Sequence, residues 1–498
     1  MVLGEVLKGT GAALDAVTAS LEIAGITHDS RRVRPAFAFF ALTGRMADGH
    51  SYAADAMKHG AAVCICERRI EGLPLPQVVL PNARRALAFA AANFYGNPQR
   101  RMRLVGVTGT NGKTSTAYML KTIFSHGGYK TALLGTAKGS IGDAAYTPPL
   151  DAAEADEYET MTTPDPEVLY RTLADLAARG VEVTVMEASS HALALDKLAP
   201  IEFALGIFTN LSHEHLDFHG SMENYLAAKA KLFDSCRVGL FNADDAAGRE
   251  LLQNTACRAV SYGLTSPCDY LAEEIESYGV RGSSYLLHTR GARFRVKTQI
   301  PGSFTLYNTL AAAAAARECG VDLICIQNAL YALRGIAGRL EKVNLGFMGG
   351  AFTVFIDYAH TPFALENLLR CVRAFRGTGQ RIVTLFGCGG ARDREKRPEM
   401  GRIAVENSDF VILTSDNPRA EEPQAILADI LKGVGKADNY TVIENRREAI
   451  EYAVANALAG DIILLVGKGH EQYEIDKDGL HPFSETEIVQ EAAERYRS

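Results

Sequence analysis

The most regular feature of the sequence is the alternation of short apolar runs with longer stretches of helical periodicity. Apolar runs such as Val181–Met186, Ala204–Phe208 and Arg381–Phe386 alternate with segments, such as Pro362–Phe375, in which apolar residues recur at helical spacing. Strands and helices that alternate in this way are typical of parallel sheets covered by helices. The pattern therefore predicts an α/β fold.

Breaks in this pattern divide the chain of 498 residues into three consecutive domains. Turn-forming residues at Tyr95–Pro98 and at Leu333–Gly338 mark the two boundaries. We expect an N-terminal domain over 1–100, a central P-loop-type domain with a parallel sheet covered by helices over 101–335, and a C-terminal Rossmann-like domain over 336–498. Three domains also agree with a typical size of about 150 residues per domain.

Two unusual stretches lie within the central domain. Asp151–Thr160 is acidic and has no strand pattern, so we expect it to be a surface excursion. Ala311–Ala316 is a run of alanines. Because alanine has the highest intrinsic helix propensity, this run predicts a closely packed helix.

Composition narrows the class of protein. The chain is 47% hydrophobic and 22% charged, which is ordinary for a globular protein, and its net charge of -7 argues against a nucleic-acid partner. No apolar run is long enough for membrane insertion, and the sequence start lacks the pattern of a signal peptide. The nine cysteines contain no CxxC pair and are typical of reduced thiols. We therefore expect a cytoplasmic protein. We also expect it to be a monomer.

A glycine-rich turn between a strand and a helix predicts a nucleotide-phosphate site. The strand Met102–Val107 leads into the turn, and a helix is expected from Lys113. Glycines let the backbone approach phosphate oxygens, and amides at a helix N-terminus face the anion. Lys113 would reach the outer phosphates, and the Thr114 hydroxyl would ligate Mg²⁺. The candidate binding residues are Gly109, Thr110, Asn111, Gly112, Lys113 and Thr114.

Two further strand ends carry side chains that suit a metal ion. Glu187 follows the strand Val181–Met186, and ligands gather at the carboxyl ends of parallel strands, so it should lie at the same edge as the glycine turn. A carboxylate there suits a Mg²⁺ that Thr114 and phosphate oxygens hold. The next strand end leads to the histidine-rich segment Ser212–Gly220, for which zinc is the alternative. We favour magnesium, with His215 as a functional residue, because the spacing does not match a helical HExxH motif.

The segments that follow these strand ends are distinctive when read together. They are VTGTNGKT (107–114), MTTPDP (161–166), MEASSHAL (186–193), FTNLSHEHLDFHG (208–220) and ENYLAAKAKLF (223–233). In this order they resemble the Mur ligase family of cell-wall enzymes. The resemblance runs from Asp29 almost to the C-terminus. It implies an ATP-driven amide ligase that works through an acyl phosphate.

The resemblance also implies roles for individual residues. Lys229 matches a family lysine that is carbamylated, and the resulting carboxylate oxygens can ligate Mg²⁺ where an ammonium cannot. Lys229 and His215 would hold one Mg²⁺, while Thr114 and Glu187 would hold another. Lys113, Lys229, His215 and Glu187 are thus the expected catalytic residues. From the residues alone, Lys229 is an ordinary solvated helix lysine.

Two substrates are implied in the same way. The acceptor is UDP-N-acetylmuramoyl-L-alanyl-D-glutamate, and its expected binding residues are Ser30, Arg45, Met46, Ala47, Thr162, Thr163, Ser189 and Lys197. Lys197 stands where the family commonly has arginine, and Leu195 where it has glutamine. Further ATP contacts are expected from Asn308, Arg339, Asp357 and His360.

The motif DNPR (416–419) resembles that of the family members that add meso-diaminopimelate. This amine carries a second amino-acid centre whose carboxylate suits a bidentate guanidinium. The expected diaminopimelate-binding residues are Arg392, Asp416, Asn417, Pro418, Arg419, Gly467 and Glu471. Alternatives are a relative that adds L-lysine or another amine, a folylpolyglutamate synthetase-like enzyme, a P-loop ATPase or kinase without ligation, and a non-catalytic binding protein.

Overall fold

The computed structural model describes residues 1–44, 47–136, 139–151, 154–155, 157–158, 161–265, 267–346 and 351–495. The chain forms two compact units. Unit 1 comprises Met1–Leu271, His288–Ala292 and Leu310–Ile326, and unit 2 comprises Ala272–Leu287, Arg293–Thr309 and Gln327–Ser498. The predicted α/β class is confirmed in both units, while the division into three domains stays a prediction.

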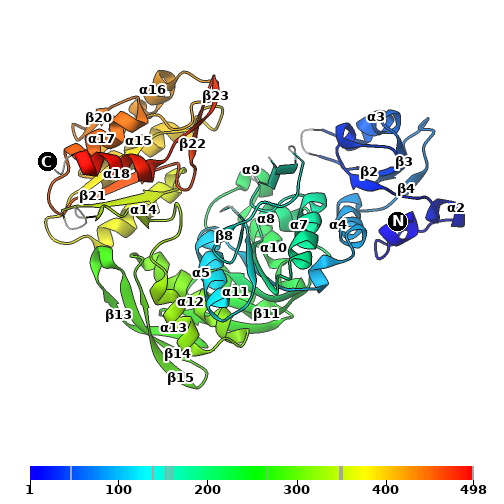
Figure 1. Ribbon diagram of the computed structural model, residues 1–498, viewed down its shortest axis with the longest axis horizontal. Helices are drawn as coiled ribbons and strands as arrows, with labels where there is room; N and C mark the ends of the chain where they lie inside the picture. Colours follow the sequence, from blue (N-terminus) through cyan, green and yellow to red (C-terminus); the bar gives the residue numbers. More distant parts are fainter. Residues whose placement is uncertain are drawn as a thin grey trace. The chain divides into compact units, whose positions relative to one another are not determined.

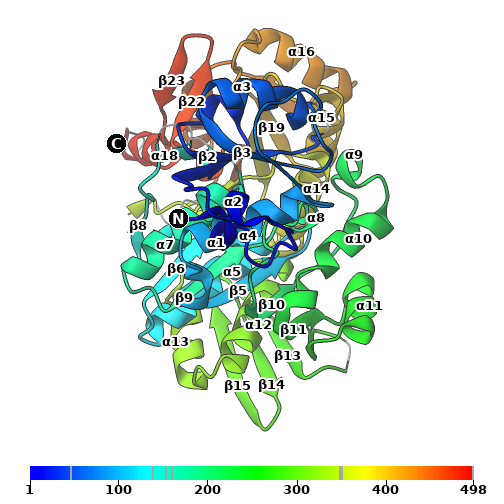
Figure 2. The same cartoon turned by 90° about the vertical axis from the view of Figure 1, so that its right-hand side faces the viewer.

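The N-terminal part of unit 1 is a parallel sheet of four short strands in the order β1-β2-β3-β4. Figure 2 shows β2 and β3 of this sheet with α3 beside them. Helix α4 packs against β1 and β2 and also against α7 of the following segment. The strands are β1 Gly25–Thr27, β2 Phe37–Ala41, β3 Ala61–Cys66 and β4 Gln77–Val79; the described helices are α1 Leu3–Val6, α2 Ala16–Ala19, α3 Ala53–Lys58 and α4 Ala83–Phe94.

The larger part of unit 1 is built on a sheet in which β12-β11-β10-β5-β9-β6 are neighbours and parallel. The edge strands β7 and β8 are antiparallel, so the predicted parallel sheet describes the centre of the sheet but not this edge. The strands are β5 Arg103–Thr108, β6 Thr131–Leu134, β7 Ser140–Ile141, β8 Ala144–Ala145, β9 Val183–Glu187, β10 Phe203–Phe208, β11 Cys236–Asn242 and β12 Arg258–Gly263.

Register brings the ends of three strands to one level. Val107 of β5 pairs with Glu187 of β9 on one side and with Ile207 of β10 on the other. The loops after β5, β9 and β10 therefore leave the sheet at the same edge. Helix α5 packs against β5, β6 and β9, and α11 against β11 and β12 (Figure 1). The helices of this part are α5 Lys113–His126, α7 Pro166–Ala178, α8 Ser190–Ala194, α9 Leu216–His219, α10 Met222–Ala230 and α11 Ala246–Asn254.

Two helices and three strands follow before the C-terminal sheet, and their residues fall partly in each unit. They are β13 Tyr270–Ser277, β14 Ser283–Thr289, β15 Ala292–Thr298, α12 Ser303–Glu318 and α13 Leu323–Ala332. The alanine run Ala311–Ala316 lies within α12 and is fully buried, which confirms the predicted packed helix.

Unit 2 is built on a sheet in the order β16-β17-β21-β18-β19-β20, parallel except for β16. Alternate residues of each strand face opposite cores: Phe355 packs with α14, α15 and α16, whereas Val354 packs with α17 and α18. The elements are β16 Glu341–Lys342, β17 Thr353–Asp357, α14 Pro362–Phe375, β18 Ile382–Phe386, α15 Lys396–Asn407, β19 Phe410–Leu413, α16 Pro423–Val434, β20 Tyr440–Val442, α17 Arg446–Ala455, β21 Ile462–Val466, β22 Tyr473–Asp476, β23 Gly479–Pro482 and α18 Glu485–Arg495.

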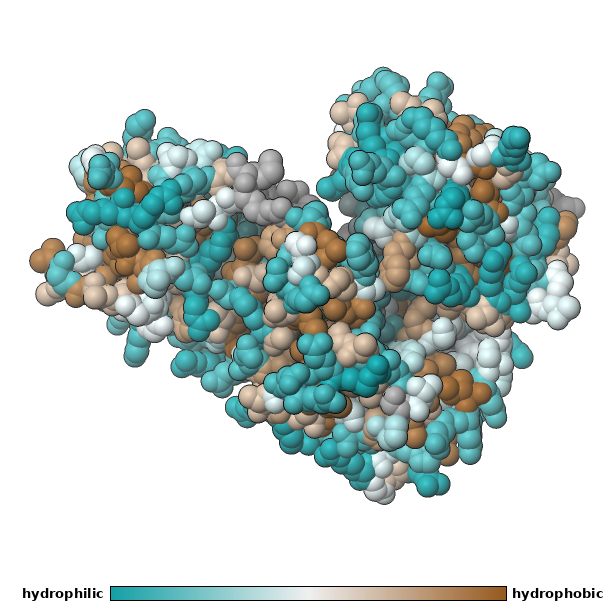
Figure 3. Space-filling view, turned by 180° about the vertical axis from the view of Figure 1, so that it is seen from behind, coloured by the Kyte–Doolittle hydropathy of each residue, from teal (hydrophilic) through white to brown (hydrophobic). Residues whose placement is uncertain are grey.

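The surface is mainly hydrophilic, with separate apolar patches on the face that Figure 3 shows. Within the described ranges, no helix has the length and apolar character needed to cross a membrane.

The acidic stretch Asp151–Thr160 differs from the prediction. Parts of its described residues are helical, and Glu154 is buried between two arginines. The predicted surface excursion is therefore wrong for this residue, because ion pairing allows a carboxylate to be buried.

Candidate active site

The glycine-rich turn lies between β5 and α5, as predicted. Gly109 and Gly112 have φ values of +145° and +82°. Residues that carry a side chain rarely adopt these backbone conformations. A Cβ on Gly109 would lie 1.9 Å from the Thr209 hydroxyl, so glycine is required there. Lys113 folds back over the turn and donates to the carbonyl oxygens of Gly109 (3.1 Å) and Thr110 (2.8 Å).

The loop after β10 holds the turn in place. The Asn111 amide donates to the Asn210 side chain (3.0 Å), and the Thr209 hydroxyl donates to the Asn111 carbonyl (2.6 Å). The Ser212 amide donates to the Thr110 hydroxyl (2.9 Å). The two strand-end loops therefore form one hydrogen-bonded unit.

Glu187 lies next to the start of α5. Its carboxylate is 1% exposed and accepts from the Thr114 hydroxyl at 3.1 Å. It also accepts from the backbone amide of Thr136 at 2.9 Å. The hydroxyl and carboxylate are hard oxygen donors of the kind that Mg²⁺ prefers, so these residues fit that ion. Among the described residues, no three His, Cys, Asp or Glu side chains come together as a metal site, an arrangement that the zinc alternative would need.

Lys229 of α10 reaches the glycine turn from the other side. Its ammonium donates to the Gly109 carbonyl at 2.7 Å, lies 4.3 Å from the centre of the Tyr225 ring and is 1% exposed. Burial, together with the neighbouring Lys113 charge, lowers the pKa of Lys229 well below its usual value. A neutral amine in this position is the form that reacts with carbon dioxide to give a carbamate.

His215 begins α9 with a left-handed φ of 56°. Its ring lies 4.8 Å from the ring of His191 and 6.2 Å from that of Tyr225, measured between centres. Burial lowers the pKa of His215. The Glu214 charge opposes this shift, and the Lys113 charge adds to it. Burial and the two neighbouring imidazoles lower the pKa of His191 to about 4. These rings are therefore neutral near pH 7, the state in which an imidazole can ligate a metal.

Residues expected to hold the acceptor lie beside Glu187. The Thr163 hydroxyl donates to the Glu187 carbonyl (2.9 Å) and accepts from the Ser189 amide (3.2 Å). The Thr162 and Thr136 hydroxyls are 3.1 Å apart. Lys197 donates to the Thr163 carbonyl at 3.4 Å. The structure thus brings Thr162, Thr163, Ser189 and Lys197 together.

The residues expected to hold the UDP group lie in the N-terminal part of unit 1. Ser30 is buried, and its carbonyl accepts from the His59 ring at 3.1 Å. Ala47 is exposed, and its carbonyl accepts from the Gly44 amide. Arg45 and Met46 lie outside the described residues.

Four expected ATP contacts lie in unit 2. Asn308 is buried in α12. The Asp357 carboxylate accepts from the amides of Leu340 (2.7 Å) and Ala359 (2.9 Å), and burial raises its pKa. The Arg339 guanidinium lies 5.0 Å from the centre of the Tyr358 ring. The His360 ring donates from Nδ1 to the Tyr358 carbonyl at 2.9 Å.

The residues expected to bind diaminopimelate converge at strand ends of unit 2. Asn417 donates to the Glu471 carboxylate (2.7 Å) and accepts from Lys468 (2.7 Å). Arg419 donates to the Gly390 carbonyl at 3.0 Å. A Cβ on Gly389 would lie 3.0 Å from the Arg419 guanidinium and 3.8 Å from the Arg392 side chain, so the arginines flank one loop.

Acidic groups complete this cluster. Asp416 and Pro418 are buried, and a Cβ on Gly467 would lie 2.5 Å from the Asp416 carboxylate. Burial and the Asp416 charge raise the pKa of Glu471. Two arginines beside two carboxylates can receive an amino acid that carries both a carboxylate and an ammonium group.

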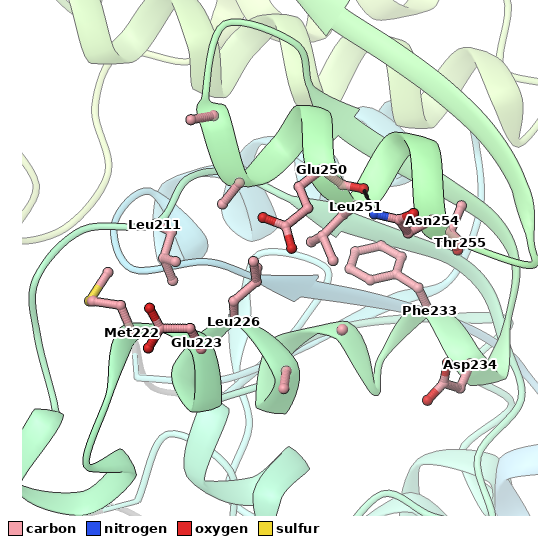
Figure 4. A pocket seen from close by; sticks show the side chains of 14 residues that line it. Leu211, Met222, Glu223, Leu226, Phe233, Asp234, Glu250, Leu251, Asn254 and Thr255 are labelled. Carbon is pink, nitrogen blue, oxygen red and sulfur yellow. Dashed lines mark hydrogen bonds between the residues drawn. The ribbon is translucent and has the colours of Figure 1, made fainter.

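A cavity of about 470 Å³ lies on the other side of α10, between this helix and α11 (Figure 4). The residues that line it include Leu226, Phe233, Leu251, Glu223 and Glu250. It contains none of the expected site residues. The candidate active site is therefore defined by strand-end loops and not by this cavity.

Sequence reasoning missed several residues of the site. Thr136 and Tyr225 contact Glu187 and the glycine turn, and Lys468 holds Asn417. Thr136 follows β6, so its position at another strand end was the available signal.

Three family models match the chain. The Mur ligase middle domain matches residues 107–316, the Mur ligase glutamate ligase domain matches 338–469, and the Mur ligase family catalytic domain matches 22–95. A protein of Clostridium tetani named UDP-N-acetylmuramoyl-L-alanyl-D-glutamate--2,6-diaminopimelate ligase is 40% identical, with 99% of each chain covered. The chain belongs to the Mur ligase family.

Other comparisons agree with this assignment. A Listeria monocytogenes protein of the same name is 37% identical to this Mur ligase, with 97% of each chain covered. A solved structure of a ligase with that name has a TM-score of 0.71 and 30% identity, and covers 100% of this chain and 99% of its own. The folylpolyglutamate synthase of Mycobacterium tuberculosis shares the fold, with a TM-score of 0.61. It is 20% identical, and the comparison covers 83% of this chain and 94% of the synthase.

Proposed function

We propose that this Mur ligase joins meso-diaminopimelate to UDP-N-acetylmuramoyl-L-alanyl-D-glutamate, using ATP, as a cytoplasmic monomer. One observation carries the proposal: the glycine turn, Glu187 and Thr163 form one hydrogen-bonded set at a single sheet edge. The names of full-length relatives at about 40% identity support the choice of substrates.

The reaction begins at the D-glutamyl carboxylate. One of its oxygens attacks the γ-phosphorus of ATP, the bond to ADP breaks, and an acyl phosphate forms. Lys113 offsets charge on the transferred group. Thr114 and Glu187 would hold one Mg²⁺, and His215 with carbamylated Lys229 would hold a second. When bound, these ions stabilise the charge that develops on the phosphoryl oxygens.

The amine then completes the amide. The neutral amino group of diaminopimelate attacks the acyl carbon, phosphate leaves with the electrons of the C–O bond, and the nitrogen loses a proton. Arg392 and Arg419 would bind the carboxylate at the distal centre of diaminopimelate, and Asp416 and Glu471 its ammonium. Lysine has no such carboxylate, so we propose that these residues select against it.

ADP release tests the proposal. The enzyme is assayed with ATP, Mg²⁺ and the UDP-linked dipeptide in three parallel reactions. These contain diaminopimelate, L-lysine or no amine. We expect ADP formation that depends on diaminopimelate and is much slower with lysine. ADP formed equally without an amine would identify an ATPase, and faster turnover with lysine would overturn the choice of amine.

A further inference from the structure

A series of charged contacts links the short 3-10 helix Ser30–Arg32 and the residues before it to the start of α7. The Glu167 carboxylate accepts from the backbone amide of His28 at 3.0 Å and contacts its Nδ1 at 2.7 Å through the same oxygen. Glu167 is only 5% exposed, and its second oxygen has no hydrogen-bond partner within the described part of the chain. The imidazolium of His28 is therefore the charge that compensates this buried carboxylate.

The series continues to the loop that carries Thr163. The Asp165 carboxylate lies 3.8 Å from His28 Nε2 and 2.6 Å from Lys197 Nζ. Lys197 in turn donates to the Thr163 carbonyl. Charged contacts thus run without interruption from His28 to Thr163.

A second ionic contact lies on the other side of Ser30. Arg32 pairs with Glu154 at 2.6 Å, and Glu154 pairs with Arg171 of α7 at 2.5 Å. Glu154 belongs to the acidic stretch and is 6% exposed. Ser30 is therefore held on both sides, by His28 and by Arg32, against the segment that carries Thr163.

We propose that Glu167 and Glu154 are positioning residues, which set the spacing between the UDP subsite at Ser30 and the peptide subsite at Thr163. This inference rests on the proposed function, since only a ligand that spans both subsites senses the spacing. A displacement of about 1 Å can cost about 100-fold in rate when reacting groups must be aligned. Neither carboxylate is among the residues expected to bind the acceptor.

Two conservative variants, Glu167→Gln and Glu154→Gln, test the proposal. Each is assayed with the UDP-linked dipeptide and with the muramoyl dipeptide that lacks UDP. We expect a roughly tenfold rise in KM for the UDP-linked acceptor, with unchanged KM for ATP and diaminopimelate. The truncated acceptor should be turned over as well by the variants as by the wild type, because it does not span the two subsites.

The matched control is Arg179→Ala, which removes an exposed ion pair with Asp175 (2.7 Å) at the other end of α7. This variant should leave KM for both acceptors unchanged. The proposal would be overturned if the glutamine variants lost activity equally with the UDP-linked and the truncated acceptor. It would also be overturned if KM for the UDP-linked acceptor changed less than twofold in folded variants. Thermal unfolding identifies a variant that does not fold. Arg32→Lys then tests the contact with Glu154, and His28→Gln tests the contact with Glu167. If the wild type itself fails to use the UDP-linked acceptor, the proposed function fails instead.

Discussion

Lys229 illustrates how burial changes the chemistry of one side chain. By sequence alone it is a helix lysine, and only the resemblance to a family gave it a role. The structure adds a physical reason, since a buried ammonium next to Lys113 is costly and its pKa falls well below the usual value. The residue is thereby suited to carbamylation.

Replacing Lys229 tests this role. Lys229→Ala should lower kcat roughly 100-fold, because a group that stabilises phosphoryl charge is lost. Short-chain carboxylic acids should restore part of the activity by supplying oxygens in the vacated space. Steady-state ADP release measures both effects.

Lys231, directly after the last residue of α10, offers a control. Its pair with Asp196 (2.9 Å) is at the surface, so Lys231→Ala should leave kcat nearly unchanged. Full activity of Lys229→Ala would show that the assignment is wrong.

At the scale of elements, the turns between strands and helices set the site. The helix expected from Lys113 is α5, and the helix expected over Pro362–Phe375 is α14 with the same bounds. The strand expected over Met102–Val107 is β5, one residue further along at Arg103–Thr108. These elements were predictable because their apolar periodicity and caps are local. The loops between these elements contact one another across long sequence separations. Those contacts could not be predicted from the local sequence.

The glycine turn provides a stability prediction. Gly109→Ala should lower the free energy of unfolding by about 3 kcal/mol, from a disfavoured φ and a clash with Thr209. Gly128→Ala is the control, because Gly128 has a φ of +83° but no atom near its Cβ position, and should cost about 1 kcal/mol. Urea unfolding of both variants separates the clash from the backbone strain. An equal loss of unfolding free energy in the two variants would show that the clash with Thr209 makes no contribution.

A buried ion pair joins α17 to α18 in unit 2. Arg446 and Glu485 are 2.8 Å apart and almost fully buried, and Arg446 also donates to the Ser415 and Val466 carbonyls, next to Asp416 and Gly467. No role was predicted for Glu485 from the sequence. These contacts place Arg446 against the two strand-end loops that carry Asp416 and Gly467, both expected to bind diaminopimelate.

Removing the arginine should therefore have two effects. Arg446→Met leaves a buried carboxylate without its partner and should cost about 3 to 5 kcal/mol of stability in urea unfolding. It should also raise KM for diaminopimelate more than KM for ATP. Arg447→Met, which removes an exposed pair with Glu491, should change stability by less than about 1 kcal/mol. If Arg446→Met lost no more stability than Arg447→Met, the ion pair between Arg446 and Glu485 would not be buried as described.

At the scale of the whole molecule, charged contacts within unit 1 join the N-terminal sheet to the sheet that carries the glycine turn. Burial alone would lower the pKa of His28, but the charge and hydrogen bond of Glu167, with the charges of Asp165 and Glu157, raise it to about 9. Protonation of His28 therefore stabilises the folded state.

This shift predicts a pH dependence of stability. Because the folded pKa lies above the unfolded value of 6.5, the contribution is fully present below pH 6.5 and is lost as pH rises through about 9. Calorimetry should show that unfolding temperatures of the wild type and Glu167→Gln differ most at pH 6 and converge by pH 10. A difference that grows with pH would contradict this account.

The sequence by itself determined the α/β class, the alternation of strands and helices, the glycine turn and the order of the motifs. These follow from periodicity and from backbone preferences that act over a few residues. Only the tertiary structure decided which charged groups are buried together. His28 and Glu167 are 139 residues apart, and Glu154 lies in a stretch whose charge predicted exposure. Whether a carboxylate is solvated or paired depends on what the folded chain places beside it, and local sequence does not contain that information.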